Sequence, residues 1–367
     1  MNKSVIGVGI AAVVGVAGYI GYTTFMAAAP AGYTETNIDI GATALPDVAA
    51  VCPGLDAHPL LVCLAGTLKA GVTPEVLADL QQPYTVTEAT QQSNFPPMGY
   101  PDRVGPILAS FTAEQRGIIK AMLMQAASLT ANKGYDEIEQ ILNADDFLQV
   151  QTSDTAGFSS GNYLIAFLGT PAAVGTWELY FGGHHLAFGN TFTDGVLTGA
   201  TPSFRGVEPF VPFTQNGREN APMVQEIAAV LTALSPGQAG VAKLGEVYTN
   251  IIAGPQEDDA IPTANEGVRV GDLAPDQQAL VVAAIETYVG DIAVADADMI
   301  MARYLAELPQ TFVAFAGTPT LDAENDYVRI DGPSVWIEIS MQPGRSLDGI
   351  HPHSVWRDKA LDYGGNE

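Results

Sequence analysis

Four of the five histidines in this 367-residue chain fall in two short motifs with apolar flanks. The motif "GGHHLAF" contains His184 and His185, and "HPHSVWRD" contains His351 and His353. In an extended segment His351 and His353 point to the same side, as two histidines must to bind one ion. Adjacent residues of a strand point to opposite sides, so one of His184 and His185 can join that pair. The two preceding glycines leave the choice between them open.

Imidazoles in this pattern are typical of a transition-metal site. Three neutral imidazoles, or two with a carboxylate, suit Zn²⁺, Cu²⁺ or Fe²⁺ and leave a coordination position open. Glu338 is a charged residue inside the apolar run "SVWIEIS", and a buried carboxylate needs a partner. We expect it to bind the ion, to orient an imidazole or to act as a general base.

The second histidine motif also contains Arg357 and Asp358. A guanidinium at this position could hold a substrate carboxylate through two hydrogen bonds. The alternative is structural: histidine pairs on strands serve as hydrogen-bonded core residues, and Glu338 with Arg357 would be a buried ion pair without a functional role.

Two apolar runs with the same turn signal indicate an internal repeat. They are "YLIAFLGTP" at 163–171 and "TFVAFAGTP" at 311–319, each followed by a second segment typical of a strand. Helix-opening phrases such as "FTAEQ" and "LSPGQ" precede apolar-periodic runs. We therefore predict an α+β fold of two pseudo-symmetric helix-then-β-hairpin repeats, 106–225 and 226–367, with amphipathic helices packed on an antiparallel sheet.

Two further motifs have local consequences. "TDGV" at 193–196 favours a tight turn, so residues 184–192 are predicted to pair with residues 196–201. "GFSSG" places Ser159 in a G-x-S-x-G pattern, but a nucleophile elbow needs a strand before the serine and a helix after it. Here the order is reversed, which predicts an ordinary loop.

The first part of the chain indicates export. Residues 1–31 combine a positive start, an apolar run and small residues, which predicts a signal peptide or an uncleaved N-terminal membrane anchor. Residues 32–105 form a Pro/Gly-rich lead-in with one helix at "TPEVLADL" and a loop closed by Cys52 and Cys63, and 106–367 form the main domain. We expect a periplasmic or extracellular protein.

Composition limits the partners. With 47% hydrophobic residues the chain can bury a full core. The formal charge of −26, from 41 acidic and 15 basic side chains, repels phosphate backbones and anionic lipids. Nucleic acid is excluded as a partner, and membrane contact is expected only through the N-terminal segment if it stays uncleaved. The oligomeric state is left open.

Together with "ATPSFRG" and "YVRIDGPSVWIEIS", the histidine motifs and the ending "HPHSVWRDKALDYG" resemble the bacterial family known as domain of unknown function 3500. The similarity covers about residues 95–365. Lys359 stands where the family usually has a proline, and Arg205 with Glu208 replace less polar residues. The resemblance implies a fold and a shared polar centre but no reaction. That centre would comprise His184, His185, Glu338, His351, His353, Arg357, Asp358, Asp362 and Tyr363.

These observations predict an exported metal-dependent enzyme of oxidative or hydrolytic chemistry, with copper, zinc or iron as its ion. The metal ligands are expected among His184, His185, His351 and His353, and the catalytic groups are Glu338, Arg357 and Asp358. The alternative is a non-catalytic periplasmic or surface protein that binds a metal ion or a small anionic ligand. A purely structural role would require the histidines to lie apart in space.

Overall fold

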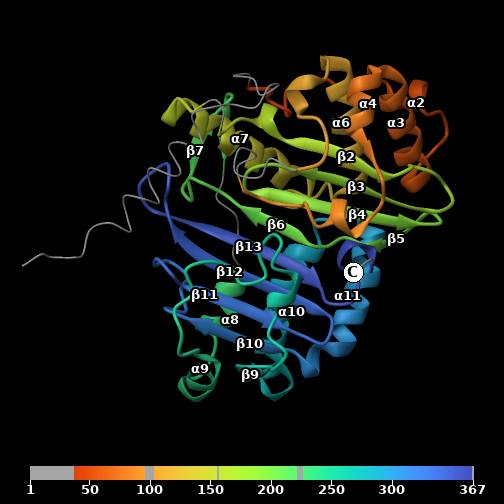
Figure 1. The fold of residues 1–367 in the computed structure, drawn as a ribbon. Coiled ribbons are helices and arrows are strands. Elements are labelled where there is room, and N and C mark those ends of the chain that lie inside the picture. The colour runs from red at the N-terminus through yellow and green to blue at the C-terminus, as the bar shows by residue number, and fades with distance from the viewer. Residues whose placement is uncertain (1–36, 96–102, 155–156, 221–225, 366–367) are drawn as a thin grey trace, which may run out of the picture.

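A single long sheet runs through the molecule (Figure 1). The computed structural model describes residues 37–95, 103–154, 157–220 and 226–365. Among these residues, eleven strands form the sheet in the order β1-β2-β3-β4-β6-β13-β12-β11-β10-β9, with β5 beside β4. The strands are β1 (Gln81–Gln82), β2 (Leu164–Gly169), β3 (Thr176–Gly182), β4 (Leu186–Thr193), β5 (Val196–Gly199), β6 (Ser203–Gly206), β9 (Val268–Arg269), β10 (Phe312–Ala316), β11 (Tyr327–Asp331), β12 (Val335–Pro343) and β13 (Ile350–Asp358).

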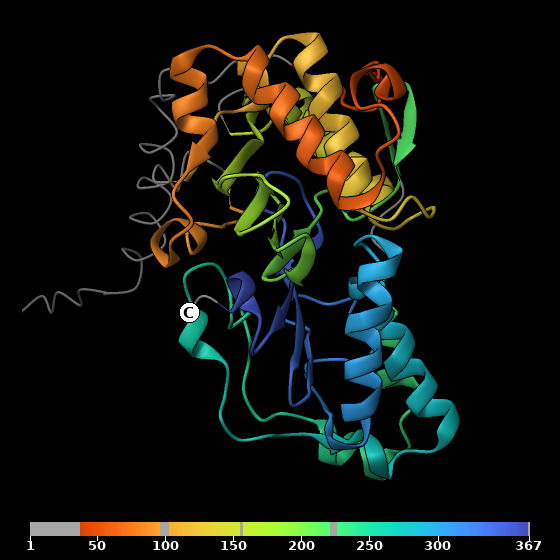
Figure 2. The ribbon, with the colours of Figure 1, turned by 90° about the vertical axis from the view of Figure 1, so that its right-hand side faces the viewer.

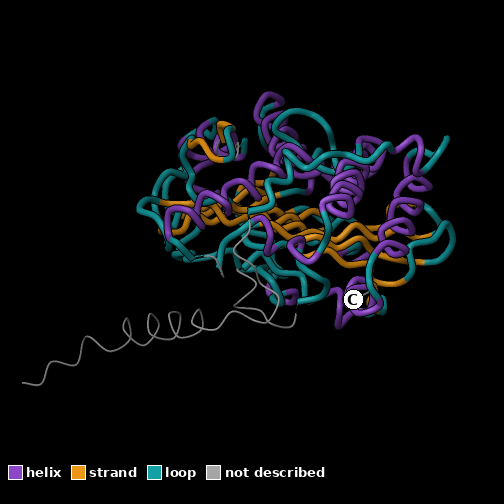
Figure 3. The backbone as a smooth tube through the Cα atoms, turned by 90° about the horizontal axis from the view of Figure 1, so that it is seen from above, coloured by secondary structure: helices purple, strands orange, loops and turns teal. Residues whose placement is uncertain are grey.

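Helices cover mainly one face of this sheet, as the views along its edge show (Figures 2 and 3). The first half of the chain provides α2 (Val48–Val51), α3 (Ala57–Gly71), α4 (Pro74–Leu80), α5 (Val86–Ala89), α6 (Ala113–Ala126) and α7 (Tyr135–Thr152). The second half provides α8 (Ile227–Thr232), α9 (Pro236–Ala242), α10 (Pro275–Val289) and α11 (Val294–Glu307). A separate ribbon pairs β7 (Phe213–Gln215) with β8 (Arg218–Asn220).

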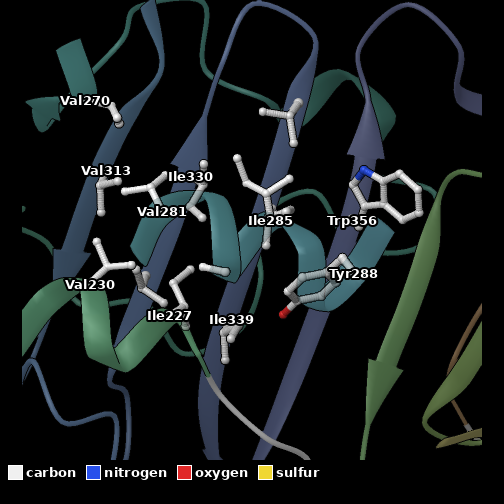
Figure 4. Close-up of a cluster of buried hydrophobic side chains, with 14 of the residues drawn as sticks. Ile227, Val230, Val270, Val281, Ile285, Tyr288, Val313, Ile330, Ile339 and Trp356 are labelled. Atoms are coloured by element: carbon white, nitrogen blue, oxygen red, sulfur yellow. The ribbon is translucent and has the colours of Figure 1, made fainter. Parts of the chain in front are cut away.

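Strict alternation along the strands separates the two faces. In β12, Ile337 and Ile339 enter the core beneath α8 and α10, part of which is drawn in Figure 4. Their neighbours Trp336 and Glu338 point to the opposite face. That face is covered by loops, among them the segment around Ile251. Glu338, Ser340 and Gln342 of β12 therefore share with His351, His353 and Arg357 of β13 the face that the helices leave to loops.

The α+β class with helices packed on a large sheet is confirmed. The sheet is mixed, because β1 pairs in parallel with β2, and this corrects the expected purely antiparallel arrangement. The capping boxes that open α6 and α9 are present at Thr112 and Ser235. The β4–β5 hairpin also forms, with Asp194 and Gly195 at positive φ in its turn.

The lead-in contains more helix than the sequence indicated. The helix at "TPEVLADL" is α4, capped by Thr73 as expected, but α3 was not predicted. The disulfide between Cys52 and Cys63 is confirmed, and it ties α3 to the segment before it. His58, on α3, accepts a hydrogen bond from the indole N–H of Trp177 at 3.2 Å.

The predicted signal peptide or anchor at residues 1–31 lies outside the described residues. Within the described ranges, the protein has no helix of the length and hydropathy needed to cross a membrane. Ser159, in the described part of "GFSSG", lies before a short 3₁₀ helix, Ser160–Asn162, that leads into β2. Its hydroxyl accepts a hydrogen bond from Gly161 N, which is the loop geometry expected from the reversed element order.

Glu178, in the middle of β3, gives the fold a testable pH dependence. Burial raises the pKa of its carboxyl to about 7, against hydrogen bonds from Thr191 and Gln92 that favour the ionised form. A carboxyl group whose pKa is higher in the folded than in the unfolded state contributes its full stability to the fold below the unfolded pKa. That contribution is lost as the pH rises through the folded pKa. Glu178→Gln should therefore raise the free energy of unfolding by roughly 3 kcal/mol at pH 8 and by little at pH 4. Urea denaturation at both pH values measures this difference, and an equal effect at the two would contradict it.

Candidate metal centre

His184 and His185 lie in the turn between β3 and β4, which corrects their expected place in a strand. Gly183 N donates to Leu186 O at 2.7 Å to close the turn, and His185 has a φ of +62°. A side chain at Gly183 would meet the Tyr163 ring at 2.5 Å, which is why the turn needs glycine there. The opposite-side rule for adjacent strand residues therefore does not apply to this pair.

Neighbouring segments hold the turn from several directions. His185 N donates to Asn94 O at 2.8 Å, and Gly206 N at the end of β6 donates to His185 O at 2.7 Å. The Tyr163 hydroxyl donates to His184 O. A non-glycine residue in the left-handed region costs about 1 kcal/mol or more, so these contacts fix His185 in a conformation that it would not adopt alone.

His351 and His353 lie on β13 as the alternation predicted. They pair across β12 with Gln342 and Ser340, on the face that the helices leave uncovered. Their Nε2 atoms are 3.2 Å apart. Two nitrogens bound to one tetrahedral zinc at about 2.0–2.1 Å would lie about 3.3 Å apart. The pair is therefore spaced as two ligands of one ion.

The structure resolves the choice between His184 and His185. The ring centroid of His185 lies 5.2 Å from that of His351 and 5.2 Å from that of His353, and the latter two are 4.9 Å apart. One ring nitrogen from each of the three histidines lies within 4.8 Å of the others. His185 is thus the third histidine of this group. The turn between β3 and β4 brings it close to β13, although β6 lies between β4 and β13 in the sheet.

These imidazoles are buried, and several of their nitrogens are unsatisfied. Neither Nδ1 nor Nε2 of His185 has a hydrogen-bond partner among the described residues, and the same holds for Nδ1 of His351. Buried ring nitrogens normally find a donor or acceptor, because an unpaired polar atom in the interior is costly. A metal ion would accept a lone pair from such a nitrogen, so the donor set fits a transition metal.

The protonation state of the three rings also suits a metal. Burial lowers the pKa of His185 and of His353 well below its ordinary value, with charge on the neighbouring histidines adding to the effect. Burial lowers the pKa of His351 to about 4. Neutral imidazole is the form that binds metal ions, so no proton has to be displaced at neutral pH.

His184 is held by a carboxylate that sequence reasoning missed. Its Nδ1 lies 2.7 Å from Oδ1 of Asp145 on α7, and its ring stacks on that of His185 at 3.7 Å. Burial raises the pKa of the Asp145 carboxyl, and the charge of His184 opposes this. A signal was present in the sequence: Asp145 follows Ile141 and Leu142 on the buried stripe of α7, where an apolar residue is expected.

The four histidines line one cavity of about 100 Å³. Its other lining residues are Asn94, Phe95, Phe158, Glu208, Gln342, Arg345 and Ser346. Arg103 secures one wall, since it donates to Phe95 O at 2.8 Å and to the Tyr180 hydroxyl at 3.0 Å. The three converging nitrogens therefore face a space that a further ligand can enter.

Comparison with known families identifies the chain. The family model described as "Protein of unknown function (DUF3500)" matches residues 58–365. The chain belongs to the DUF3500 family. The match begins earlier than the resemblance over residues 95–365 suggested, and it includes α4 and almost all of α3. No curated protein and no solved structure matches the chain.

In this DUF3500 chain, Glu338 lies outside the histidine cavity, contrary to the expected grouping. Its carboxylate accepts hydrogen bonds from Ile252 N at 2.9 Å, Ala253 N at 2.7 Å and the Tyr327 hydroxyl at 2.8 Å. Glu338 points to the same face as His353, but it pairs with Val355, the next residue of β13 on that face. Its backbone partners, Ile252 and Ala253, belong to a loop that covers this face, so Glu338 holds that loop against the sheet.

Arg357 and Asp358 are also placed away from the cavity. Arg357 donates to Ala253 O at 2.9 Å and forms ion pairs with Asp258 at 2.7 Å and Asp362 at 2.9 Å. Asp358 accepts a hydrogen bond from the Tyr304 hydroxyl at 2.7 Å, on the helix-covered face. These contacts use the charges of both residues inside the fold, and neither residue lines the histidine cavity as expected.

The remaining DUF3500 positions divide in the same way. Tyr363 donates to Asp258 at 2.8 Å and belongs to the Arg357 cluster. Of the two departures from the family pattern, Arg205 lies on the helix side between Glu137, at 2.5 Å, and Asp291, whereas Glu208 lines the histidine cavity. Within the family pattern, the four histidines thus form one centre, and Arg357, Asp362 and Tyr363 form a separate buried cluster with Asp258.

Proposed function

We propose that His185, His351 and His353 hold one transition-metal ion and that the protein is a metal-dependent enzyme of oxidative or hydrolytic chemistry. The observation that supports this most strongly is the convergence of three buried, neutral imidazoles on one cavity, with both nitrogens of His185 unpartnered among the described residues. Three nitrogen ligands suit copper, zinc or iron and leave a position for water or substrate. Such an ion supplies Lewis acidity or redox chemistry when bound.

Asp145 and His184 complete the proposed centre from one side. The Asp145 carboxylate accepts the Nδ1–H of His184, which fixes the ring and its tautomer. His184 also lines the cavity, so its Nε2 is the ring atom left to hold or accept a proton there. This pair takes the positioning and proton-holding role that the sequence had suggested for Glu338.

The non-catalytic alternative differs in its coordination sphere. A protein that only stores or senses a metal would close the sphere with a fourth side chain. The 100 Å³ cavity beside the three nitrogens favours an open position instead. It is far larger than the roughly 10–15 Å³ that one water molecule needs. We therefore favour an enzyme.

Export is part of the proposal. The Cys52–Cys63 disulfide supports an oxidising compartment, together with the signal-like composition of residues 1–31. The protein would act in the periplasm or outside the cell, with membrane contact only through that N-terminal segment. Nucleic acid is no partner, given the formal charge of −26.

The two-repeat architecture is also proposed, with support from the strand order. From one edge of the sheet β2, β3 and β4 lead to β6, and from the other β10, β11 and β12 lead to β13. Ala127 and Ile292, which follow α6 and α10, pair with each other. Gly105 and Gly267 have φ values of +97° and +106°, and each lies against the first strand of its half. The halves meet at β6 and β13, beside the histidines.

Metal content tests the proposal directly. We expect protein purified without a histidine tag and dialysed against metal-free buffer to retain about one transition-metal ion per chain, measured by inductively coupled plasma mass spectrometry. Metal-stripped protein should bind one equivalent of Co²⁺ with absorption bands of a four- or five-coordinate nitrogen site. Protein that carries no metal and binds no Co²⁺ would refute the proposed centre.

A further inference from the structure

We propose that the cavity binds a small carboxylate, whose anionic group pairs with Arg345 while its other end faces the three histidines. This inference rests on the proposed metal function and names the substrate class for the same site. It is carried by the position of one arginine, the loop that holds it and an unpaired amide in the same cavity lining.

Arg345 is the one cationic side chain among the described residues that line the cavity, apart from the neutral histidines. It is exposed and takes part in no ion pair within the described ranges.

The loop that holds Arg345 is fixed by a buried carboxylate. Oε1 of Glu208 accepts hydrogen bonds from Ser346 N at 3.2 Å and Leu347 N at 3.0 Å. Gly344 N donates to Gly349 O at 2.7 Å and closes the base of the same loop. One carboxylate oxygen of Glu208 thus accepts hydrogen bonds from backbone N–H groups next to Arg345. The Glu208 carboxylate and the Arg345 guanidinium form no ion pair.

The lining of the cavity offers a second donor. Nδ2 of Asn94 is buried and has no hydrogen-bond partner among the described residues, although the backbone oxygen of Asn94 accepts from His185 N. Asn94 lines the same cavity as Arg345. An amide donor and a guanidinium around one space call for a ligand rich in acceptor oxygens. A carboxylate matches the planar guanidinium through two parallel hydrogen bonds.

The size of the space limits the ligand. The cavity of about 100 Å³ accommodates a molecule of a few heavy atoms within its walls. The formal charge of −26 disfavours anions at long range, so a local cation is needed to retain one. Acetate and oxalate are therefore suitable probes, with acetamide as a neutral molecule of the same shape and inorganic phosphate as a bulkier oxyanion.

The test uses Co²⁺-loaded protein, whose absorption changes when a probe binds the ion or displaces water from its open coordination position. Wild type, Arg345→Gln and the control Arg269→Gln are titrated with each probe. Arg269 is an exposed arginine on β9, away from the cavity, so its replacement makes the same change in net charge. We expect acetate and oxalate to perturb the bands of wild type, with at least about tenfold weaker binding in Arg345→Gln and no change in Arg269→Gln.

The outcomes separate this inference from the proposed function. Co²⁺ titration without probes comes first, and failure to bind Co²⁺ removes both. If Co²⁺ binds but Arg345→Gln retains full affinity for oxalate, or acetamide binds as well as acetate, only the carboxylate inference fails. Arg345-dependent binding of phosphate that is tighter than that of oxalate would also overturn the assignment to a carboxylate.

Discussion

Replacing His185 with asparagine is expected to weaken Zn²⁺ binding by the metal-stripped protein on the order of a thousandfold. His185 is the ligand that the first half of the chain contributes, and its nitrogens have no other partner among the described residues. Loss of a residue that only supports a ligand costs about 10–100-fold, so loss of the ligand itself costs more. Asparagine tolerates the left-handed backbone at this position, which keeps the turn intact. Competition with a chromophoric chelator measures the affinity.

Two further variants calibrate this result. His184→Ala removes the ring that stacks on His185 and pairs with Asp145, and it should reduce affinity by about 10–100-fold. His58→Ala removes the fifth histidine, which packs against Trp177 at the other end of β3, and it should leave affinity unchanged. Equal losses in all three variants, or none in His185→Asn, would contradict the assignment of ligands.

Replacing Arg357 with methionine is expected to lower the free energy of unfolding by about 3–5 kcal/mol. Arg357 is fully buried, and methionine fills much of its volume without its charge. Asp362 would then be left as a buried carboxylate without its cation, while Ala253 O and Gly254 O would lose their donor. Urea denaturation of wild type and variant, both metal-free, measures the change.

The double variant Arg357→Met with Asp362→Asn removes both charges of the buried pair. It should be more stable than Arg357→Met alone, because no unpaired carboxylate stays in the interior. Zn²⁺ affinity of the folded Arg357→Met protein should match that of wild type, since Arg357 is not in the histidine cavity. A loss of Zn²⁺ binding without a loss of stability would contradict this assignment of Arg357 to the fold alone.

Part of the site was predictable because strands alternate. His351 and His353 share a face for that reason, and the register with β12 then aligns them with Ser340 and Gln342. The same rule failed at His184 and His185, where the chain turns. A positive φ at His185 depends on contacts with segments far along the chain, which no local pattern records.

Glu338 and Arg357 show a second limit of prediction from the sequence. Burial of their charges was predictable from the apolar strands around them, and so was the need for partners. The identity of those partners was not, because Ile252 and Ala253 belong to an irregular loop about 85 residues away. Asp145 was overlooked for the opposite reason, since it lies in an ordinary amphipathic helix and only its place on the buried stripe marks it.

The two sides of the histidine cavity come from segments that are far apart in the sequence. His185 follows β3 in the first half of the chain, and His351 and His353 lie on β13 in the second half. The two halves of the sheet join where β6 pairs with β13. An ion bound by all three imidazoles would therefore bind the folded chain and not the unfolded one, and its binding free energy would add to the stability of the junction between the halves.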